Sequence, residues 1–410
     1  MNYNFKELFS SLKGNLLILV LSMFIWTFTA QMIQPYETLY VFSLGGTGAV
    51  LGLILAIQTI FGMFLRILGG YIADTYGRRR IIGIFTIISS FGFFFYVFAE
   101  NWIWIVIGAS LASVTSLFGP ALEAIRADSV KPEERGRGYM LLNTLPKIPA
   151  IIAPAIGGIL IIDMTSEYGI DFGNARTIYL LLFFGIFLAG VIRLLFLRET
   201  LTPSKERQKP SINVFKEIYE TVANCDPYIR RLFVLQGFFM FCFHFETRFR
   251  AVYAVSVKGL STAEWGLIIT ASQAVSIIAI FVVGWFIDSY SRKKIFIPSI
   301  AFLGVGVFLF TISNTFSSLL ISMTIIATCE QSRIMALTVL IADSTPRAVR
   351  GRIFSLLNIM GSLGSSTSVL LSGILYDLNQ TLPFYVAMLM YSFATLIAIK
   401  FLREVEVRHI

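Results

Sequence analysis

Apolar residues in this chain gather into long runs that short polar segments interrupt. Most runs are about twenty residues long, which is the length that an α-helix needs to cross a hydrocarbon core about 30 Å thick. The pattern predicts an all-α membrane protein that crosses the bilayer many times. We place twelve transmembrane spans at about residues 15–42, 48–72, 80–99, 102–126, 139–162, 176–197, 231–257, 264–287, 294–313, 317–342, 353–375 and 382–401.

Composition supports this class of protein. Of the 410 residues, 56% are hydrophobic and 14% are charged, whereas a soluble domain has about a quarter charged residues. The first apolar run is too long for the core of a signal peptide, so we interpret it as a retained span. Three scattered cysteines and two histidines argue against a disulfide framework and a histidine-based metal cluster, and we expect no metal and no cofactor.

Basic residues orient the predicted spans. Most of the 33 lysines and arginines fall in the termini and in the loops that follow even-numbered spans. This asymmetry predicts that both termini and the central loop lie in the cytoplasm of a cell whose plasma membrane holds the protein. The net charge of +9 is then explained by anchors that face an anionic inner leaflet, without a nucleic-acid partner. We expect the lipid bilayer as the surroundings and a monomer.

The longest polar stretch, residues 198–228, separates two predicted domains of six helices each, residues 1–197 and 229–410. Within it, "SINVFKEIYETV" begins at Ser211, a plausible N-cap, and places apolar residues at helical spacing. A short amphipathic helix on the membrane surface is one interpretation. A disordered linker is the other.

A motif in the first half of the chain recurs in the second half. The segment "GGYIADTYGRRR" begins at Gly69, and "GWFIDSYSRKK" begins at Gly284. A second pair, "ADSVKPEERGRGYMLLN" from Ala127 and "ADSTPRAVRGRIFSLLN" from Ala342, is offset by 215 residues, against 214 for the aligned glycine, aspartate and arginine of the first pair. Two motif pairs at nearly one spacing predict two halves duplicated in the same orientation.

The first segment resembles the loop that follows span two in the major facilitator superfamily, where the pattern reads Gly-x-Leu-Ala-Asp-x-x-Gly-Arg-Lys/Arg. Here the matching residues are Gly70, Asp74, Gly77 and Arg78, and the second copy has Ser291 in place of the second glycine. The resemblance covers essentially the whole chain. It implies twelve helices in two pseudo-symmetric halves and transport by alternating access.

The resemblance also implies a cytoplasmic latch, a set of ion pairs and helix-end contacts that stabilises one end state. Asp74 would face the N-terminus of span eleven, where the helix dipole favours negative charge, and Arg78 would pair with Asp128. An alternative interpretation as ordinary positive-inside anchors explains Arg79 and Arg80 but not the acids at repeat-related positions. The predicted latch residues are Gly70, Asp74, Gly77, Arg78, Asp128, Asp288, Arg292 and Asp343.

Ionisable residues inside spans are costly to bury, which makes each one a candidate for a substrate and proton cavity. Glu330 falls near the predicted midplane, with Arg333 one turn nearer the cytoplasm on the same face. Burial favours the neutral form of an acid and an adjacent arginine favours the ionised form, so Glu330 is the best candidate for proton coupling. The predicted cavity residues are Gln31, Gln34, Glu37, Lys147, His244, Glu246, Arg248, Glu330 and Arg333.

Other charged residues have structural interpretations. Glu123 and Arg126 have helix-neighbour spacing close to the membrane surface, which favours a structural pair. For Arg248 and Arg250, an outer gate and a substrate role both stay open. We interpret His244 as a packed, hydrogen-bonded histidine rather than a proton carrier. Three basic residues near span ends are expected to extend toward the lipid head groups: Arg66, Arg193 and Lys400.

Span five, with "LPKIPAIIAPAIGG", is predicted to bend because its prolines remove backbone hydrogen bonds. Drug:proton antiporters of the family carry Gly-x-x-x-Gly-Pro-x-x-Gly-Gly at this place. The chain keeps Pro154, Gly157 and Gly158, but Pro149 and Ala153 replace the two leading glycines. The likeness to these antiporters is therefore partial.

The sequence predicts a secondary active transporter for a small organic solute, with proton-coupled export as the leading interpretation. Lys147 and Arg333 would suit a carboxylate or phosphate, which leaves uptake or symport of an anionic or zwitterionic metabolite as the alternative. A receptor on the same fold that does not transport is a third possibility. We identify neither a phosphate-binding loop, which a primary pump would need, nor a clustered nucleophile and base, which an enzyme would need.

Overall fold

The computed structural model describes residues 12–130, 141–142, 144–163, 168, 170–201, 225–289, 291–345 and 350–403. Within this part of the chain the regular structure is helical, and one isolated β-bridge joins Ile162 to Ile170. Ten helical segments are long and apolar enough to cross a membrane. The other two predicted spans correspond to the short apolar segment Pro149–Leu160 and to the charged segment 227–257. The twelve-helix prediction is confirmed.

The chain divides into two compact units. Unit 1 contains Met1–Gly46 and Ile57–Pro210, and unit 2 contains Thr47–Ala56 and Ser211–Ile410. The division near residue 210 falls in the central polar stretch. The predicted surface helix from Ser211 and both chain ends lie outside the described residues.

Unit 1 contains one helix that continues from unit 2 and nine helical segments of its own. The shared helix is α4 (Gly48–Tyr76), whose first turns belong to unit 2. The others are α2 (Asn15–Ile33), η1 (Gln34–Tyr36), α3 (Glu37–Ser43), α5 (Arg78–Val97), α6 (Trp102–Ala112), α7 (Thr115–Asp128), η3 (Pro149–Ile151), α9 (Ala153–Leu160) and α10 (Phe172–Phe196).

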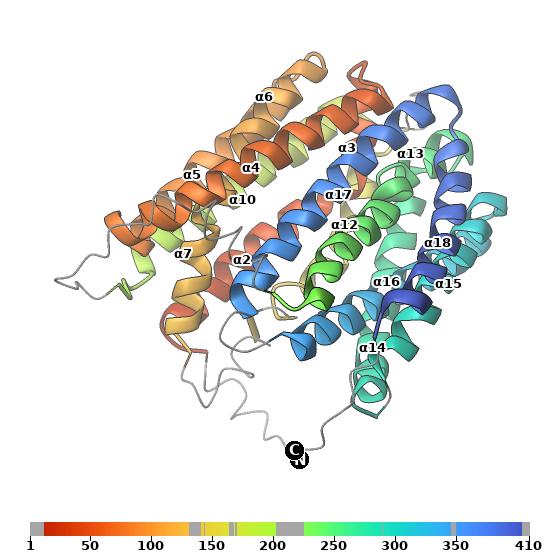
Figure 1. Ribbon diagram of the computed structural model, residues 1–410. Coiled ribbons are helices and arrows are strands. Elements are labelled where there is room, and N and C mark those ends of the chain that lie inside the picture. Colours follow the sequence, from red (N-terminus) through yellow and green to blue (C-terminus); the bar gives the residue numbers. More distant parts are fainter. Residues whose placement is uncertain are drawn as a thin grey trace. The chain divides into compact units, whose positions relative to one another are not determined.

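Helices α5 and α10 pack side by side in unit 1 (Figure 1). Gly83 on α5 and Gly190 on α10 make the close approach possible, because a Cβ on either would overlap Leu194 or Ile87. Small residues commonly allow helices in membranes to approach in this way. A buried core of aliphatic and aromatic side chains in unit 1 includes Leu19, Ile82, Phe118 and Ile125.

Prolines interrupt two spans of unit 1. At Pro35 the first span changes from α2 to the 3₁₀ turn η1 and then to α3. The fifth span has the 3₁₀ turn η3 before α9, which agrees with the predicted bend. The hydroxyl of Tyr36 donates to the carbonyl of Pro154 at 2.6 Å, so the two interrupted helices are tied together where each one departs from α-helical geometry.

Unit 2 contains eight helical segments in addition to the first turns of α4. In chain order they are α12 (Pro227–Thr247), α13 (Arg250–Val252), η4 (Tyr253–Val257), α14 (Thr262–Ser289), α15 (Arg292–Ile312), α16 (Phe316–Ser344), α17 (Arg350–Leu378) and α18 (Leu382–Phe401). Helix α12 runs along α17, and α16 contacts both α14 and α15 (Figure 1). Gly237 and Gly364 lie where α12 and α17 approach closely, because a Cβ on Gly364 would overlap the carbonyl of Gly237.

The first turn of α4 is held by α17 within unit 2. The carboxylate of Asp377 accepts a hydrogen bond from the backbone N–H of Gly48 at 2.7 Å and another from Ala49 at 2.9 Å. Gly373 faces Gly48 so closely that a Cβ on Gly373 would overlap the Gly48 carbonyl. Asp377 therefore satisfies two of the N–H groups that every helix N-terminus leaves without an intrahelical partner.

Many large apolar side chains are exposed on both units. Phe64 and Phe184 in unit 1 and Leu389 in unit 2 are 56%, 55% and 73% exposed, respectively. Exposed apolar surface on this scale is unfavourable in water and normal against lipid. The distribution agrees with a protein that spans the bilayer many times.

Candidate functional site

A network of charged side chains lies inside the predicted spans of unit 2. Glu246 near the end of α12 and Arg250 at the start of α13 are one helical turn apart, and Arg250 binds Glu246 through two hydrogen bonds. The Nε–Oε2 distance is 2.6 Å and the Nη2–Oε1 distance is 2.5 Å. Such a two-point contact is the strongest arrangement of a guanidinium and a carboxylate.

The same arginine also binds an acid from another helix. Nη1 of Arg250 donates to Oε1 of Glu330 on α16 at 2.8 Å. One guanidinium therefore serves two carboxylates, so the three groups together carry a charge of −1 when both acids are ionised. We refer to Glu246, Arg250 and Glu330 as the acid–arginine triad.

The two acids of the triad have different surroundings. The side chain of Glu246 is 0% exposed, that of Arg250 is 6% and that of Glu330 is 19%. Glu246 also accepts a hydrogen bond from the hydroxyl of Tyr391 on α18, at 3.3 Å. Glu246 is thus enclosed and bound at both oxygens, whereas Glu330 is held at one oxygen and remains partly accessible.

Arg333 lies one turn from Glu330 on α16, yet the structure contains no ion pair between them. The partner of Glu330 is Arg250. The guanidinium of Arg333 instead lies 4.3 Å from the ring centroid of Phe243. Arg333 is 2% exposed, and its Nε and Nη1 have no hydrogen-bond partner in the part of the chain that the structure describes.

The other predicted cavity residues of unit 2 surround the end of α12. Nδ1 of His244 lies 3.0 Å from the carbonyl of Met240, which makes it the donor in this contact. His244 also packs edge-on against Phe243, with ring centroids 5.0 Å apart. This is the packed histidine that we expected. Arg248 is half-buried at the C-terminal end of α12.

The predicted cavity residues of unit 1 are more dispersed. Gln31 and Glu37 are half-buried and Gln34 is exposed, on either side of the bend at Pro35. Lys147 is exposed in the turn that precedes η3. Two of the predicted cavity residues, Glu246 and Glu330, are brought together through Arg250.

The ion pair that the resemblance implies between Arg78 and Asp128 is present, and unit 2 contains a repeat-related pair. Arg78 at the start of α5 pairs with Asp128 at the end of α7, and Nη1 of Arg78 also donates to Thr200 at 3.2 Å. In unit 2, Nε of Arg292 lies 3.1 Å from the carboxylate of Asp343. The pairs are repeat-related, and their role in a latch stays a prediction. Three latch residues have side-chain surroundings outside the described residues: Gly70, Asp74 and Asp288.

Gly77 is required by the geometry of the loop. It has a φ of 93°, in the left-handed region that glycine adopts without a steric penalty. Arg79, two residues after Gly77, reaches the last turn of α10, where its Nε donates to the carbonyl of Leu194 at 2.8 Å. Its repeat counterpart Lys293 donates to the carbonyl of Ile399 in the last turn of α18, also at 2.8 Å. The repeat therefore preserves a helix-capping contact that the sequence analysis had assigned to topology alone.

Arg193 corrects another expectation. We expected its side chain to extend toward the head groups, but it is 2% exposed. Its guanidinium donates to the hydroxyls of Ser22 at 3.0 Å and Thr86 at 3.1 Å, and it lies 5.3 Å from the ring centroid of Trp26. The structure thus encloses a guanidinium among hydroxyls and aromatic rings.

The expected Glu123–Arg126 pair is present at 2.6 Å.

The sequence analysis singled out Arg250 without connecting it to either acid, and it did not identify Tyr391 as a neighbour of Glu246. The four-residue spacing between Glu246 and Arg250 was a usable signal for a pair on one helix face. No signal within the sequence connects either residue with Tyr391, which lies 145 positions away from Glu246. That contact depends on the packing of α18 against α12.

Twelve spans, a repeated six-helix pattern and charged groups enclosed within the spans are typical of a secondary transporter. The chain belongs to the Major Facilitator Superfamily, whose family profile matches residues 17–263 and 249–409. It is accordingly a multi-pass membrane transporter and not an enzyme.

Curated relatives are similar over part of the chain. The multi-drug resistance efflux pump PmrA of Streptococcus pneumoniae is 27% identical over 214 residues, which cover 50% of this chain and 51% of the relative. The multidrug resistance protein MdtH of Yersinia pestis is 34% identical over 124 residues, 30% of this chain and 31% of the relative. A Na(+), Li(+), K(+)/H(+) antiporter of Planococcus maritimus is 27% identical over 143 residues, 33% of each chain. The matches therefore span about a third to a half of these relatives.

Solved structures match the fold over nearly the whole chain. The nucleoside transporter NupG aligns with a TM-score of 0.76 and 13% identity, covering 95% of this chain and 100% of NupG. The xylose transporter XylE from E. coli aligns with a TM-score of 0.67 and 16% identity, covering 96% and 97% of the two chains. At these identities the likeness concerns the fold alone.

Proposed function

We propose that this protein is a proton-coupled exporter of a small organic solute, in which Glu330 is the group that takes up and releases the proton. The observation that carries the proposal is the unequal sharing of Arg250 by two enclosed acids. The positive charge of Arg250 can neutralise one carboxylate, and Glu246 binds the guanidinium through two hydrogen bonds. The second acid, Glu330, is left with one contact and partial exposure.

This arrangement provides two protonation states with different contacts. Ionised Glu330 is held by Arg250, whereas protonated Glu330 loses most of the electrostatic attraction and can separate from α13. A conformational change that alters the Arg250–Glu330 distance then changes the proton affinity, and proton uptake in turn shifts the conformational population. Proton binding and the conformational change are coupled only if the proton binds the two conformations with different free energy, and the Arg250–Glu330 contact would provide such a difference.

Export is supported by the relatives, two of which are named as multidrug resistance proteins and one as a cation/proton antiporter. The plasma membrane and cytoplasmic termini are supported by the distribution of basic residues. We propose a monomer as the working unit.

A second candidate, symport or uptake of an anionic solute, is favoured by Arg333. Its enclosed guanidinium has two nitrogens without a described hydrogen-bond partner, and a carboxylate or phosphate is the natural ligand for such a group. Glu246, Arg250, Glu330 and Arg333 together carry no net charge when both acids are ionised. Protonation of Glu330 would give this group a charge of +1 and so would favour an anion in the same region.

The test uses everted membrane vesicles that contain the overproduced protein and generate an inwardly acidic pH gradient, followed with a pH-sensitive dye. The probes are ethidium, the carboxylate-bearing antibiotic norfloxacin, sodium chloride and uridine. Export predicts that one of the organic probes partly dissipates the gradient in vesicles with the native protein. Vesicles with the Glu330→Gln variant should show no dissipation.

Exchange of the same labelled probe in liposomes without a pH gradient separates coupling from binding. Glu330→Gln resembles the protonated acid and should retain exchange. A variant that keeps the gradient response would place coupling elsewhere, with Glu37 or Glu246 the next candidates. Dissipation only when the gradient and probe are oriented for uptake would favour the second candidate.

A further inference from the structure

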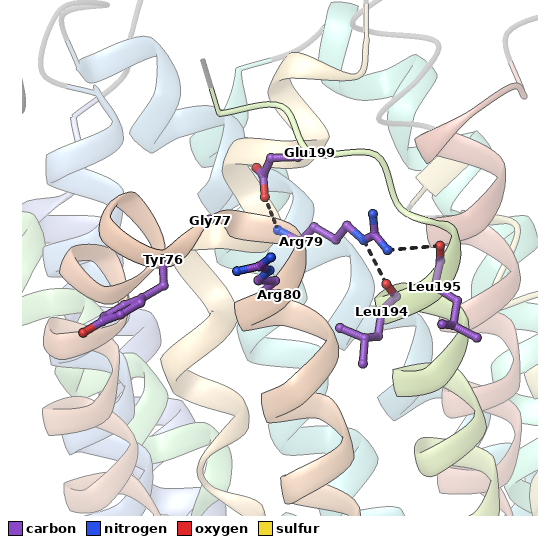
Figure 2. Close-up of a pocket in the computed structure, with 7 residues that line it drawn as sticks. All are labelled: Tyr76, Gly77, Arg79, Arg80, Leu194, Leu195 and Glu199. Atoms are coloured by element: carbon purple, nitrogen blue, oxygen red, sulfur yellow. Dashed lines mark hydrogen bonds between the residues drawn. The ribbon is translucent and has the colours of Figure 1, made fainter. Parts of the chain in front are cut away.

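A pocket of about 440 Å³ lies in unit 1 where α4 ends, α5 begins and α10 ends (Figure 2). Its size falls within the range of small-ligand sites. The charged members of its lining are Arg79, Arg80 and Glu199. The proposed transport site uses none of them.

Two of these three charged groups are already engaged by the protein. The guanidinium of Arg79 donates to the carbonyls of Leu194 at 2.8 Å and Leu195 at 3.3 Å, as the dashed lines in Figure 2 show. Glu199 accepts from the backbone N–H of Arg79 at 3.0 Å, and its other oxygen accepts from the N–H groups of Thr200 and Leu201. Glu199 is therefore occupied by backbone donors and not by a guanidinium.

Arg80 is the charged group left over. It is exposed, and within the described residues no hydrogen bond or ion pair reaches its guanidinium, which Figure 2 places beneath Gly77 on the side toward Tyr76. With two guanidinium groups and one carboxylate, the charged lining sums to +1. The pocket thus has room and charge for one anionic group.

The surroundings of the pocket indicate where the anion comes from. The pocket lies at the ends of membrane-spanning segments, at the start of Arg78–Val97 and at the end of Gly173–Phe196. Next to it, Tyr76, Leu195 and Phe196 are 66%, 59% and 62% exposed. Tyrosine favours the boundary between acyl chains and head groups, and the two apolar side chains offer a surface for an acyl chain. A soluble phosphate would make no use of this apolar surface.

We propose that this pocket binds the phosphodiester of an anionic phospholipid, with Arg80 as the phosphate ligand and the exposed surface of Leu195 and Phe196 as the contact for an acyl chain. Basic pockets at the ends of spans are suited to anionic head groups. A lipid bound in this way would connect the loop between α4 and α5 with the end of α10.

The test uses the purified full-length protein, stripped of lipid and reconstituted into bilayers of phosphatidylcholine with or without phosphatidylglycerol. Two variants are compared with the native chain. Arg80→Gln removes the proposed ligand, and Lys294→Gln removes one positive charge at the repeat-related position, which is also exposed. The two variants have the same net charge, so general attraction to an anionic bilayer is matched.

The readouts are the unfolding temperature and the number of lipid molecules retained per protein in native mass spectrometry. The proposal predicts that phosphatidylglycerol raises the unfolding temperature of the native chain and of Lys294→Gln, and that one phosphatidylglycerol is retained by both. Arg80→Gln should lose both effects while its unfolding temperature in phosphatidylcholine stays unchanged.

Three results would overturn the proposal. One is equal stabilisation of the native chain by both bilayers. Another is equal loss in the two variants, which would show charge attraction without a site. The third is full stabilisation by inorganic phosphate in phosphatidylcholine, which would assign the pocket to a soluble anion.

Discussion

Arg250 and Glu330 meet at 2.8 Å although 80 positions separate them in the chain. The contact joins α13 to α16 inside unit 2 and occupies the one guanidinium nitrogen that Glu246 does not bind. Two carboxylates therefore share one guanidinium inside unit 2. Because Glu246 is more deeply buried than Glu330, substitutions of the two acids should differ in their effect on stability.

Glu246→Gln should destabilise the protein much more than Glu330→Gln. Removing the carboxylate of Glu246 breaks a fully enclosed two-point pair and leaves Arg250 with one partner, a change that typically costs about 3–5 kcal/mol. Glu330→Gln removes a contact that is partly accessible and leaves the Glu246–Arg250 pair intact, so we expect a cost of about 1 kcal/mol. Thermal unfolding of the purified variants in one detergent measures the difference.

A double variant provides the control for this comparison. Glu246→Gln combined with Arg250→Met removes the charge along with its partner, and should recover part of the stability lost in Glu246→Gln alone. If Glu246→Gln and Glu330→Gln unfold at the same temperature, the two acids are equivalent and the assignment of separate roles fails.

The latch role of the loop pairs predicts that Arg78→Gln and Arg292→Gln nearly abolish transport while the proteins remain folded. Each arginine pairs with an acid in its own unit, Asp128 and Asp343, and such charge-assisted contacts stabilise one state selectively by about 1–3 kcal/mol. Uptake of the active probe into everted vesicles measures the loss. Lys294→Gln is the matched control, since it removes an exposed charge from the first turn of α15, two residues after Arg292. This variant should transport normally.

The periodic features of the fold could be predicted from the sequence, and the contacts between distant segments could not. The lengths of the apolar runs identified twelve spans, and the family resemblance indicated the Arg78–Asp128 pair. The repeat relates this pair to Arg292–Asp343, because equivalent positions in duplicated halves have equivalent neighbours. Gly77 was identified from the family pattern, and its φ of 93° explains why glycine suits this position.

The partner of Glu330 could not be predicted from the sequence, for a physical reason. Spacing along one helix places Arg333 near Glu330, but another segment supplies Arg250 as the partner, and the guanidinium of Arg333 lies over the ring of Phe243. The position of Arg193 near a span end suggested exposure, whereas two hydroxyls and an aromatic ring from other segments enclose it. Hydropathy contains no information about which side chain a neighbouring helix supplies.

Arg193 provides a prediction that separates charge from volume. Arg193→Lys should be more destabilising than Arg193→Met. A lysine keeps the enclosed charge but loses the planar fork that reaches both hydroxyls, and it is more strongly hydrated than a guanidinium. Methionine removes the charge and fills the space, while Ser22 and Thr86 keep hydrogen bonds to the carbonyls of Leu19 and Ile82.

We expect Arg193→Lys to lower the free energy of unfolding by about 2–4 kcal/mol, and Arg193→Met to lower it by less than half of that amount. Chemical unfolding in mixed micelles measures both. A methionine variant less stable than the lysine variant would show that the positive charge itself stabilises unit 1, and would point to an anionic partner for Arg193.

The contact between Asp377 and the first turn of α4 leads to the last prediction. Asp377→Ala removes the acceptor of two backbone N–H groups, and the loss of such a helix-end acceptor typically costs about 1 kcal/mol. Residues 47–56 should then open more often, so that their amide hydrogens exchange about fivefold faster. Hydrogen exchange followed by mass spectrometry of peptides from this segment measures the change.

The matched control is Asp171→Ala in unit 1, since Asp171 accepts from the N–H of Asn174 at 2.7 Å at the start of α10. That control should accelerate exchange at residues 172–175 and leave 47–56 unchanged. Unaltered exchange of 47–56 in Asp377→Ala would show that the close packing of Gly48 on Gly373, and not the carboxylate, holds this end of α4.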